Sequence, residues 1–447
     1  MKKILSYILL FICTVMVLFI ALVVSSKIPH SAIEKNLKES TKLYRKTAGI
    51  YRIKENHRYS HIHYFADVRK LNIIYCLDSE KPIESSLWAR YYQIIKRDTN
   101  VDFINLVDES KEPNNQYLRY WHGCIAILRP LLTLFNMEQI YLINKIILSI
   151  LGIILTTMLY KKLKKLAIIF LLALILVASW YVPLCIEYSV TFYIMLITSM
   201  IAIKIENNKK NKIKKEVNEK LSKLFLITGI VTTFFDFLTT ELLTLFVPIL
   251  IIFIIRKEEN RIDKLKDEIK FITKCFALWT IGYLGMWIAK WGIASIVLHI
   301  NALDYVKDNV TLRINGLQGL NNYTELYGHV IERNLFAIPI LDYLSENFNK
   351  WEVKIAIIIS VMVFIMIINW KELKKKKYLI IIAFIGLTPY IRYLILANHS
   401  YRHAMFTFRD QIITIISFTY IIMECLNYKL VKRIMNSIKN KKIILLP

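Results

Sequence analysis

Long apolar runs separated by short basic runs are the feature that most constrains this chain. Residues 4–26 follow Met-Lys-Lys and are almost entirely apolar. The run is longer than the core of a signal peptide, and no small-residue cleavage site ends it. We therefore predict an uncleaved anchor helix over residues 1–26, because backbone groups in lipid must be paired within their own segment.

Further apolar runs approach the roughly 20 residues that a bilayer demands. The composition agrees, since 55% of the 447 residues are hydrophobic and an ordinary soluble domain is less apolar. We predict an all-α integral membrane protein, a polytopic helical bundle of about ten transmembrane helices with a long first extracytoplasmic loop. The other predicted spans are 138–160, 165–183, 186–205, 224–239, 241–256, 272–296, 353–370, 378–397 and 411–427.

The basic runs predict the orientation of these spans. Lys and Arg accumulate in cytoplasmic loops, and here every second connection carries them. The formal net charge of +26 is thereby explained by topology, and we predict no nucleic-acid partner. We predict a cell-membrane protein with both termini in the cytoplasm. The basic runs are the first three residues, 161–165, 209–223, 256–270, 371–377 and the tail 428–447.

Two long loops then lie outside. The first, residues 27–121, is long enough for a small domain, and the polar interruptions in 117–135 predict an interfacial or re-entrant helix that leads into the bundle. The bundle comprises residues 122–296 and 353–427. The second loop, residues 297–352, is rich in turn residues, and we expect it to cover the first.

Ionisable residues gather at the predicted outer ends of the spans. Charge in or beside hydrocarbon is costly and usually faces a protein cavity, so these residues are functional candidates, although any one of them would otherwise snorkel or pair with a neighbour. Together with the first loop's acids, the candidates are Arg119, His122, Arg129, Glu187, Asp236, Glu241, Arg392, His399, Arg402, His403, Arg409 and Asp410.

The stretch NHSYRHAMFTFRD, residues 398–410, holds the densest group of these candidates. If it continues the helix that begins near Asp410, then Arg402 and Arg409 share one helix face and grip one phosphate between them. His399 and His403, four residues apart, would assist as neutral donors. We expect Asp410 to hold Arg409 or to cap the helix start.

These residue types suit phosphate and sugar chemistry. Arginine binds phosphate bidentately, a carboxylate activates a hydroxyl as general base, and aromatic rings stack on sugars or form an ordinary interfacial belt. With an anchor helix, a long first external loop and a polytopic bundle, the chain resembles the GT-C class of membrane glycosyltransferases. Motifs such as RYWHG and FFDFLT also resemble those of bacterial polytopic proteins of unassigned function.

The resemblance implies transfer of a sugar from a polyprenyl-phosphate-linked donor to a saccharide or envelope-polymer acceptor, at the lipid surface. It also implies a catalytic acid in the first loop. Asp67 is the nearest match, followed by Asp78 and Asp236. The arginines and histidines above, with Glu187 and Glu241, would bind substrate. We predict no cofactor and no metal, because the Asp-x-Asp pair of metal-dependent members is absent and His61 and His63 have no third ligand nearby.

Other functions share these features. A transporter or flippase of a lipid-linked saccharide would also carry charged residues, but near the midplane and commonly within inverted repeats, and the sequence contains no such repeat. A polymerase of lipid-linked units or an assembly factor for envelope polysaccharide stays open as well.

The orientation can be tested by cysteine labelling in intact cells. We expect a cysteine at Glu84 or Asn322 to react with a membrane-impermeant maleimide, and a cysteine at Lys214 or Lys375 to react only after the membrane is disrupted. Labelling of Glu84→Cys only after disruption would contradict the orientation.

Overall fold

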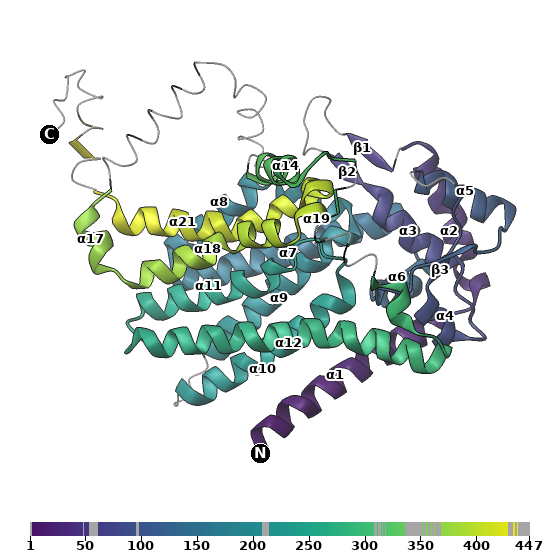
Figure 1. The fold of residues 1–447 in the computed structure, drawn as a ribbon, viewed down its shortest axis with the longest axis horizontal. Coiled ribbons are helices and arrows are strands. Elements are labelled where there is room, and N and C mark those ends of the chain that lie inside the picture. Colours follow the sequence, from purple (N-terminus) through teal and green to yellow (C-terminus); the bar gives the residue numbers. More distant parts are fainter. Residues whose placement is uncertain are drawn as a thin grey trace.

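The computed structural model describes residues 2–47, 49–52, 61–94, 98–207, 214–307, 319–335 and 368–427, with scattered positions between 311 and 317, 352 and 362, and 432 and 436. These residues form an all-α membrane protein in which a bundle of helices carries a smaller domain at one end (Figure 1). Within them, six helices are long and apolar enough to cross a membrane: α1, α7, α9, α12, α18 and the helix from Ala404 to Cys425.

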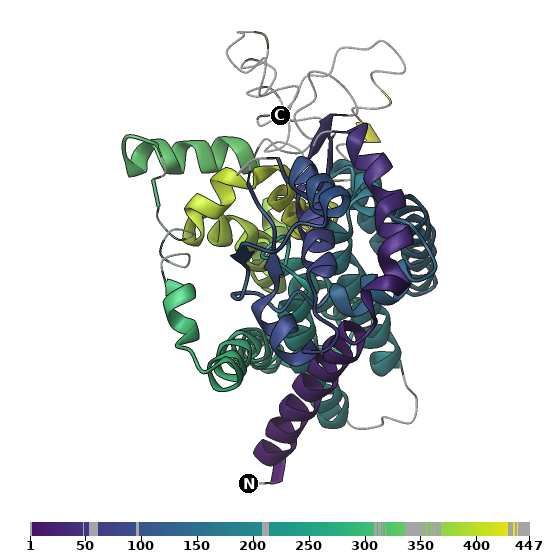
Figure 2. The same cartoon turned by 90° about the vertical axis from the view of Figure 1, so that its right-hand side faces the viewer.

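The small domain follows helix α1 (Lys2–Ser26) and consists of short helices with two antiparallel strand pairs, β1 with β2 and β3 with β4. It covers the end of the bundle that we call the domain end (Figures 1 and 2). Its elements are α2 (His30–Arg45), β1 (Ile50–Arg52), β2 (His61–His63), α3 (Tyr64–Tyr75), α4 (Pro82–Trp88), β3 (Arg90–Tyr91), α5 (Thr99–Glu109), β4 (Asn115–Gln116) and α6 (Ile125–Leu132).

The bundle alternates in direction along the chain. Its elements are α7 (Met137–Lys162), α8 (Lys164–Leu176), η1 (Ser179–Leu184), α9 (Ile186–Asn207), α10 (Lys214–Phe235), α11 (Leu242–Glu258), α12 (Leu265–Leu298), η2 (Ala302–Tyr305), α14 (Tyr323–Leu335), α17 (Trp370–Lys375), α18 (Tyr378–Ile395), α19 (Ala397–Arg402), α20 (Ala404–Thr407), η3 (Phe408–Asp410) and α21 (Gln411–Cys425).

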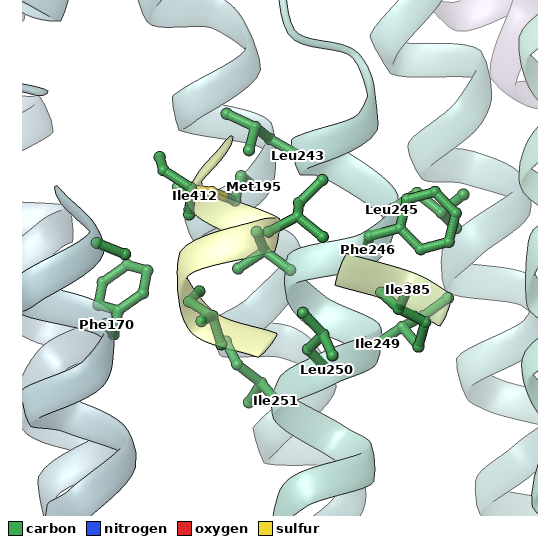
Figure 3. Packing of buried hydrophobic residues seen from close by; sticks show 14 of the residues in the cluster. Phe170, Met195, Leu243, Leu245, Phe246, Ile249, Leu250, Ile251, Ile385 and Ile412 are labelled. Atoms are coloured by element: carbon green, nitrogen blue, oxygen red, sulfur yellow. The ribbon is translucent and has the colours of Figure 1, made fainter. Parts of the chain in front are cut away.

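Helix α11 is the centre of the bundle. Every residue from Leu243 to Arg256 is buried, as expected of a helix that is hydrophobic on all sides. Its apolar side chains interlock with those of α9, α18 and α21 (Figure 3). The core therefore surrounds one helix that contacts its neighbours on all its faces.

The end of the bundle opposite the domain, which we call the basic end, is held by ion pairs. The Glu424 carboxylate accepts from Lys165, Lys257 and Lys376 at 2.7, 3.0 and 3.2 Å, so it joins α8, α11, α21 and the connection between α17 and α18. Arg256 of α11 is buried between Glu206 and Glu268, each 2.9 Å away. These contacts bring the described basic runs together at one end, as the alternation of basic and apolar segments predicts.

The structure changes several predicted spans. The span 165–183 was too long, because α8 ends at Leu176 and gives way to the 3-10 turn η1. At 1.5 Å per residue, a helix of 13 residues is about 20 Å long, short of the roughly 30 Å hydrocarbon core. Helix α10 begins at Lys214 and ends at Phe235, earlier than predicted at both ends. The span 353–370 and the tail 428–447 lie largely outside the described residues.

Two loop predictions also change. The predicted interfacial or re-entrant helix over 117–135 is confined to α6, because residues 117–124 form turns and irregular backbone. In the second loop, Tyr305 contacts Trp88 of the first loop at 5.9 Å between ring centroids. Helix α14, however, packs on α19 and α20 rather than on the first loop.

The close approach of α10 and α12 generates a stability prediction. A methyl group added at Gly282 would overlap the carbonyl oxygen of Leu226, and one at Gly229 would overlap that of Trp279. Small residues let membrane helices approach in this way. We expect Gly282→Ala to lower the free energy of unfolding by about 1–3 kcal/mol through overpacking, measured by thermal or denaturant unfolding in detergent micelles.

Gly292 in the same helix is a matched control, since nothing lies near a methyl group added there. Gly292→Ala should be neutral or stabilising, because alanine is the better helix former by about 1 kcal/mol. Equal effects of the two substitutions would show that the α10–α12 contact is looser than the structure indicates.

Candidate functional site

Two loops meet at the domain end of the bundle and form what we call the loop junction, residues 117–124 and 236–241. The Gly123 N–H donates to the Phe234 carbonyl at 2.9 Å, and a side chain at Gly123 would overlap the Phe234 ring. The Phe237 ring lies 4.6 Å from Tyr120 and 5.0 Å from His122 between centroids. The two loops are therefore one packed unit.

His122, a predicted substrate ligand, stabilises this junction. Its backbone has a left-handed φ of 56°, and its Nε2–H donates to the Tyr117 carbonyl at 2.8 Å. Complete burial lowers the pKa of His122 to about 3, so the imidazole is neutral near pH 7. Its role is to hold a tight turn, not to supply positive charge.

Asp67 is buried beneath the junction and caps helix α9. Its carboxylate accepts from the Ile186 and Glu187 backbone N–H groups at 2.7 and 3.0 Å, where it meets the positive end of the helix dipole. It also accepts from the Tyr141 hydroxyl at 3.0 Å and lies 3.6 Å from the Lys70 ammonium.

Lys70 in turn forms a buried ion pair with Glu187. The structure thus unites two predicted site residues, Asp67 and Glu187, in a network of zero or near-zero exposure. Two of its members, Lys70 and Tyr141, were missed. The three-residue spacing from Asp67 to Lys70 indicates in the sequence that the two side chains are neighbours on a helix. No sequence pattern indicates that Tyr141 joins them.

A second buried network joins Glu241, Arg392 and Asp410. The Arg392 guanidinium donates to both Glu241 carboxylate oxygens at 2.9 and 3.2 Å, and its Nε lies 3.9 Å from Asp410. Asp410 therefore faces Arg392 and forms no ion pair with Arg409 in the described structure. It occupies the N-cap position of α21, but its side chain makes no capping hydrogen bond, contrary to our expectation. The helix is broken at this point, which turns the Asp410 side chain toward α18.

The same arginine supports a strained backbone. Leu238 has a φ of 65°, unusual for a residue with a branched side chain. Its carbonyl accepts from Arg392 Nη2 at 2.9 Å and from His399 Nε2–H at 2.7 Å. Asp236, which is 1% exposed, closes the preceding turn by accepting from the Thr239 backbone N–H at 3.1 Å.

Beside the junction lies a cavity of about 560 Å³, which we call the aromatic cavity. Trp279, Tyr283, Trp287 and Trp291 of α12 form one wall at four-residue spacing. Residues four apart share a helix face, so this spacing is a signal for the wall that the sequence itself carries. Leu238, Leu396 and Tyr120 complete much of the lining, and the charged side chains on it are Arg119 and Glu241.

The cluster in 398–410 is arranged differently from the prediction. Helix α19 ends at Arg402, and α20 and η3 follow as separate short turns, so the two arginines do not continue one helix. Arg402 is exposed, whereas Arg409 is buried with its guanidinium 5.3 Å from the Tyr188 ring centre. His399 and His403 are brought together, with ring centroids 4.6 Å apart.

Two further candidates lie away from the aromatic cavity. Arg129 donates to the carbonyls of Ile28 and Ile74, at 2.5 to 3.1 Å, and so ties the ends of α1 and α3 to α6. Asp78 lies on the surface of the small domain, where it accepts from the Glu80 backbone N–H at 2.8 Å. The structure therefore separates Asp78 from Asp67 and Asp236.

Arg392 offers a test of the buried network. Arg392→Met leaves Glu241 and Asp410 buried without their cation, and we expect a loss of about 3–5 kcal/mol of unfolding free energy. Arg402→Met, in the same segment but exposed, should change it by about 0.5 kcal/mol or less. Unfolding in detergent micelles measures both, and similar stabilities of the two variants would contradict the network.

Among the described residues, no group of three or more His, Cys, Asp or Glu side chains is arranged to hold a metal ion. The site is thus defined by arginines, carboxylates and aromatic rings. The chain matches no family model, no curated protein and no solved structure.

Proposed function

We propose that this protein is a membrane glycosyltransferase that takes a sugar from a polyprenyl-phosphate-linked donor and passes it to a saccharide or envelope-polymer acceptor. The observation that carries the proposal is the aromatic cavity, which combines a long apolar wall with one arginine and one carboxylate. Such a combination suits a ligand with a hydrocarbon tail and an anionic head.

The wall of the cavity suits an isoprenoid chain. Four aromatic side chains follow the axis of α12, and Leu284 and Ile288 on its lining are 53% and 66% exposed. In a membrane, an exposed apolar side chain on a spanning helix faces lipid. A polyprenyl chain can therefore pass from the bilayer into the cavity without crossing polar surface.

Arg119 is the proposed ligand of the donor phosphate. Its guanidinium lies over Tyr117 and Tyr120, 4.3 and 5.3 Å from the ring centres, which orients it without neutralising its charge. No carboxylate forms an ion pair with it in the part of the chain that the structure describes. A half-buried guanidinium without a counter-ion favours a phosphate, which it can bind bidentately.

Glu241 is the proposed general base, because it is the carboxylate on the cavity lining. Arg392 donates to both of its oxygens and would hold it in place, and the remaining lone pairs of those oxygens would accept the proton. It would accept the proton of the acceptor hydroxyl as that oxygen bonds to the anomeric carbon. The bond from that carbon to the phosphate oxygen then breaks, and polyprenyl phosphate leaves with the electron pair. Asp67 and Asp236, both occupied by backbone N–H groups, would position the loop junction around this reaction.

The packing of the bundle favours transfer over transport. A flippase needs a polar path between the two ends of its helices. Here the central helix α11 is buried throughout, and among the described residues the candidate charges gather at the domain end. With the basic end in the cytoplasm, the proposed reaction takes place on the extracytoplasmic face of the cell membrane.

Arg119 is the sharpest test of the proposal. In nanodiscs we expect Arg119→Gln to weaken binding of a polyprenyl phosphate about 10–100-fold, the loss of one or two charge-assisted hydrogen bonds. Arg119→Lys should weaken it less, since it keeps the charge. Glu241→Gln should retain binding and lose transfer about 10²–10⁴-fold, measured with polyprenyl-phosphate-linked sugars.

Arg90 provides the matched control. It is an exposed arginine stacked on an aromatic ring, Trp88, at 5.6 Å, but it lies on the small domain outside the aromatic cavity. Arg90→Gln should bind the lipid normally. If Arg119→Gln also bound it normally, or if neutral polyprenol bound as tightly as the phosphate, the proposed function would lose its support.

A further inference from the structure

A second cavity, also of about 560 Å³, lies on the small domain, and we call it the domain cavity. It is built by the start of α2, the end of α3, α4, β3 and the segment after α5. Its volume lies in the range of small-molecule sites. None of the chemistry proposed above uses it.

Aromatic side chains form part of its surface. Trp88 is half-buried, held from one side by Tyr305 at 5.9 Å and from another by Arg90 at 5.6 Å. Tyr75 is fixed by an edge contact with His30 at 4.4 Å. Burial lowers the pKa of His30, so this imidazole contributes no charge near neutral pH. The rings are therefore neutral and in contact with neighbouring side chains, and Trp88 and Tyr75 border the cavity.

The charged side chains on the lining have no net charge in sum. Three are cationic and three are anionic: Lys81, Arg90 and Lys111 against Asp78, Glu84 and Glu112. Within the described parts of the chain, Lys81, Glu84 and Glu112 make no ion pair. Exposed opposite charges that do not pair with each other remain available to a ligand as both donors and acceptors.

This combination restricts the chemistry of the ligand. A hydrocarbon chain would leave the charged groups without water, at a cost in free energy. A polyanion would meet three carboxylates, and a polycation three cations. A hydroxyl-rich neutral ligand can hydrogen-bond to both the cationic and the anionic side chains, because each hydroxyl donates to a carboxylate and accepts from a cation. The C–H face of the ligand packs on an aromatic ring.

We propose that the domain cavity binds an uncharged saccharide segment. We assign this saccharide segment to the acceptor of the transfer reaction, and this assignment rests on the proposed function. The two cavities are neighbours: Trp88 borders the domain cavity, its contact Tyr305 precedes Val306, and Val306 lines the aromatic cavity. Asp78 then acts as a saccharide ligand, not as a catalytic base.

The binding can be measured without knowing the acceptor. The purified full chain in detergent micelles is titrated with neutral trisaccharides of glucose, galactose, mannose and N-acetylglucosamine, by saturation-transfer-difference NMR and calorimetry. We expect at least one to bind. Glu84→Gln and Trp88→Ala should each weaken that binding at least tenfold, and a heparin fragment should not compete.

Glu39→Gln is the matched control, because Glu39 is an exposed acid of the same domain that pairs with Lys42 away from the cavity. It should bind as the unchanged protein does. Glu84 is exposed, so Glu84→Gln tests the site even if Trp88→Ala disturbs folding. Failure of every trisaccharide to bind, equal binding by Glu84→Gln, or competition by heparin would overturn the proposal.

Arg119→Gln separates this inference from the proposed function. It should lose polyprenyl phosphate and keep the trisaccharide. Saccharide binding in a protein that transfers no sugar would leave the domain cavity established and the transferase proposal refuted, whereas transfer without saccharide binding would refute this inference alone.

Discussion

The structure depends on the charges at the two ends of one buried helix. Helix α11 begins next to Glu241 and carries Arg256 in its last turn, and both side chains are almost fully buried. The carboxylate lies at the positive end of the helix dipole and the guanidinium at the negative end, which is the favourable arrangement. Each also needs a counter-ion, because an unpaired buried charge costs several kcal/mol. Arg392 supplies it at the domain end, and Glu206 and Glu268 at the basic end.

These counter-ions determine which elements surround α11. Arg392 is on α18, and its other contacts, with Asp410 and the Leu238 carbonyl, tie the start of α21 and the loop junction to the same point. Asp67 does the same for the small domain, since its carboxylate receives the first N–H groups of α9. The left-handed backbones of Leu238 and His122 persist because hydrogen bonds hold them, from Arg392 and His399 to the Leu238 carbonyl and from the His122 ring to the Tyr117 carbonyl. The wall of the aromatic cavity is thereby built from segments far apart in the chain.

The two cavities divide the chemistry of the proposed reaction. One joins an apolar wall to the Arg119 guanidinium, which has no ion-pair partner among the described residues, and the other joins aromatic rings to equal numbers of positive and negative side chains. An amphiphilic donor and a hydroxyl-rich acceptor require these two surfaces respectively. Trp88 and Tyr305 link them through a direct ring contact, because Trp88 borders the domain cavity and Tyr305 precedes Val306 of the aromatic cavity.

The sequence by itself determined the class of fold and the alternation of basic and apolar segments, because hydrophobic length and the position of lysines act locally. It also located the charged residues of the domain end, among them Glu187, Glu241 and Arg392. Only the tertiary structure decided their partners. Asp67 resembles a catalytic acid in sequence but caps α9, Asp410 faces Arg392 rather than its neighbour Arg409, and Arg402 and Arg409 have different exposures. The physical reason is that the orientation and role of a buried charged side chain depend on the group that pairs with it. Here that group comes from a helix many residues away.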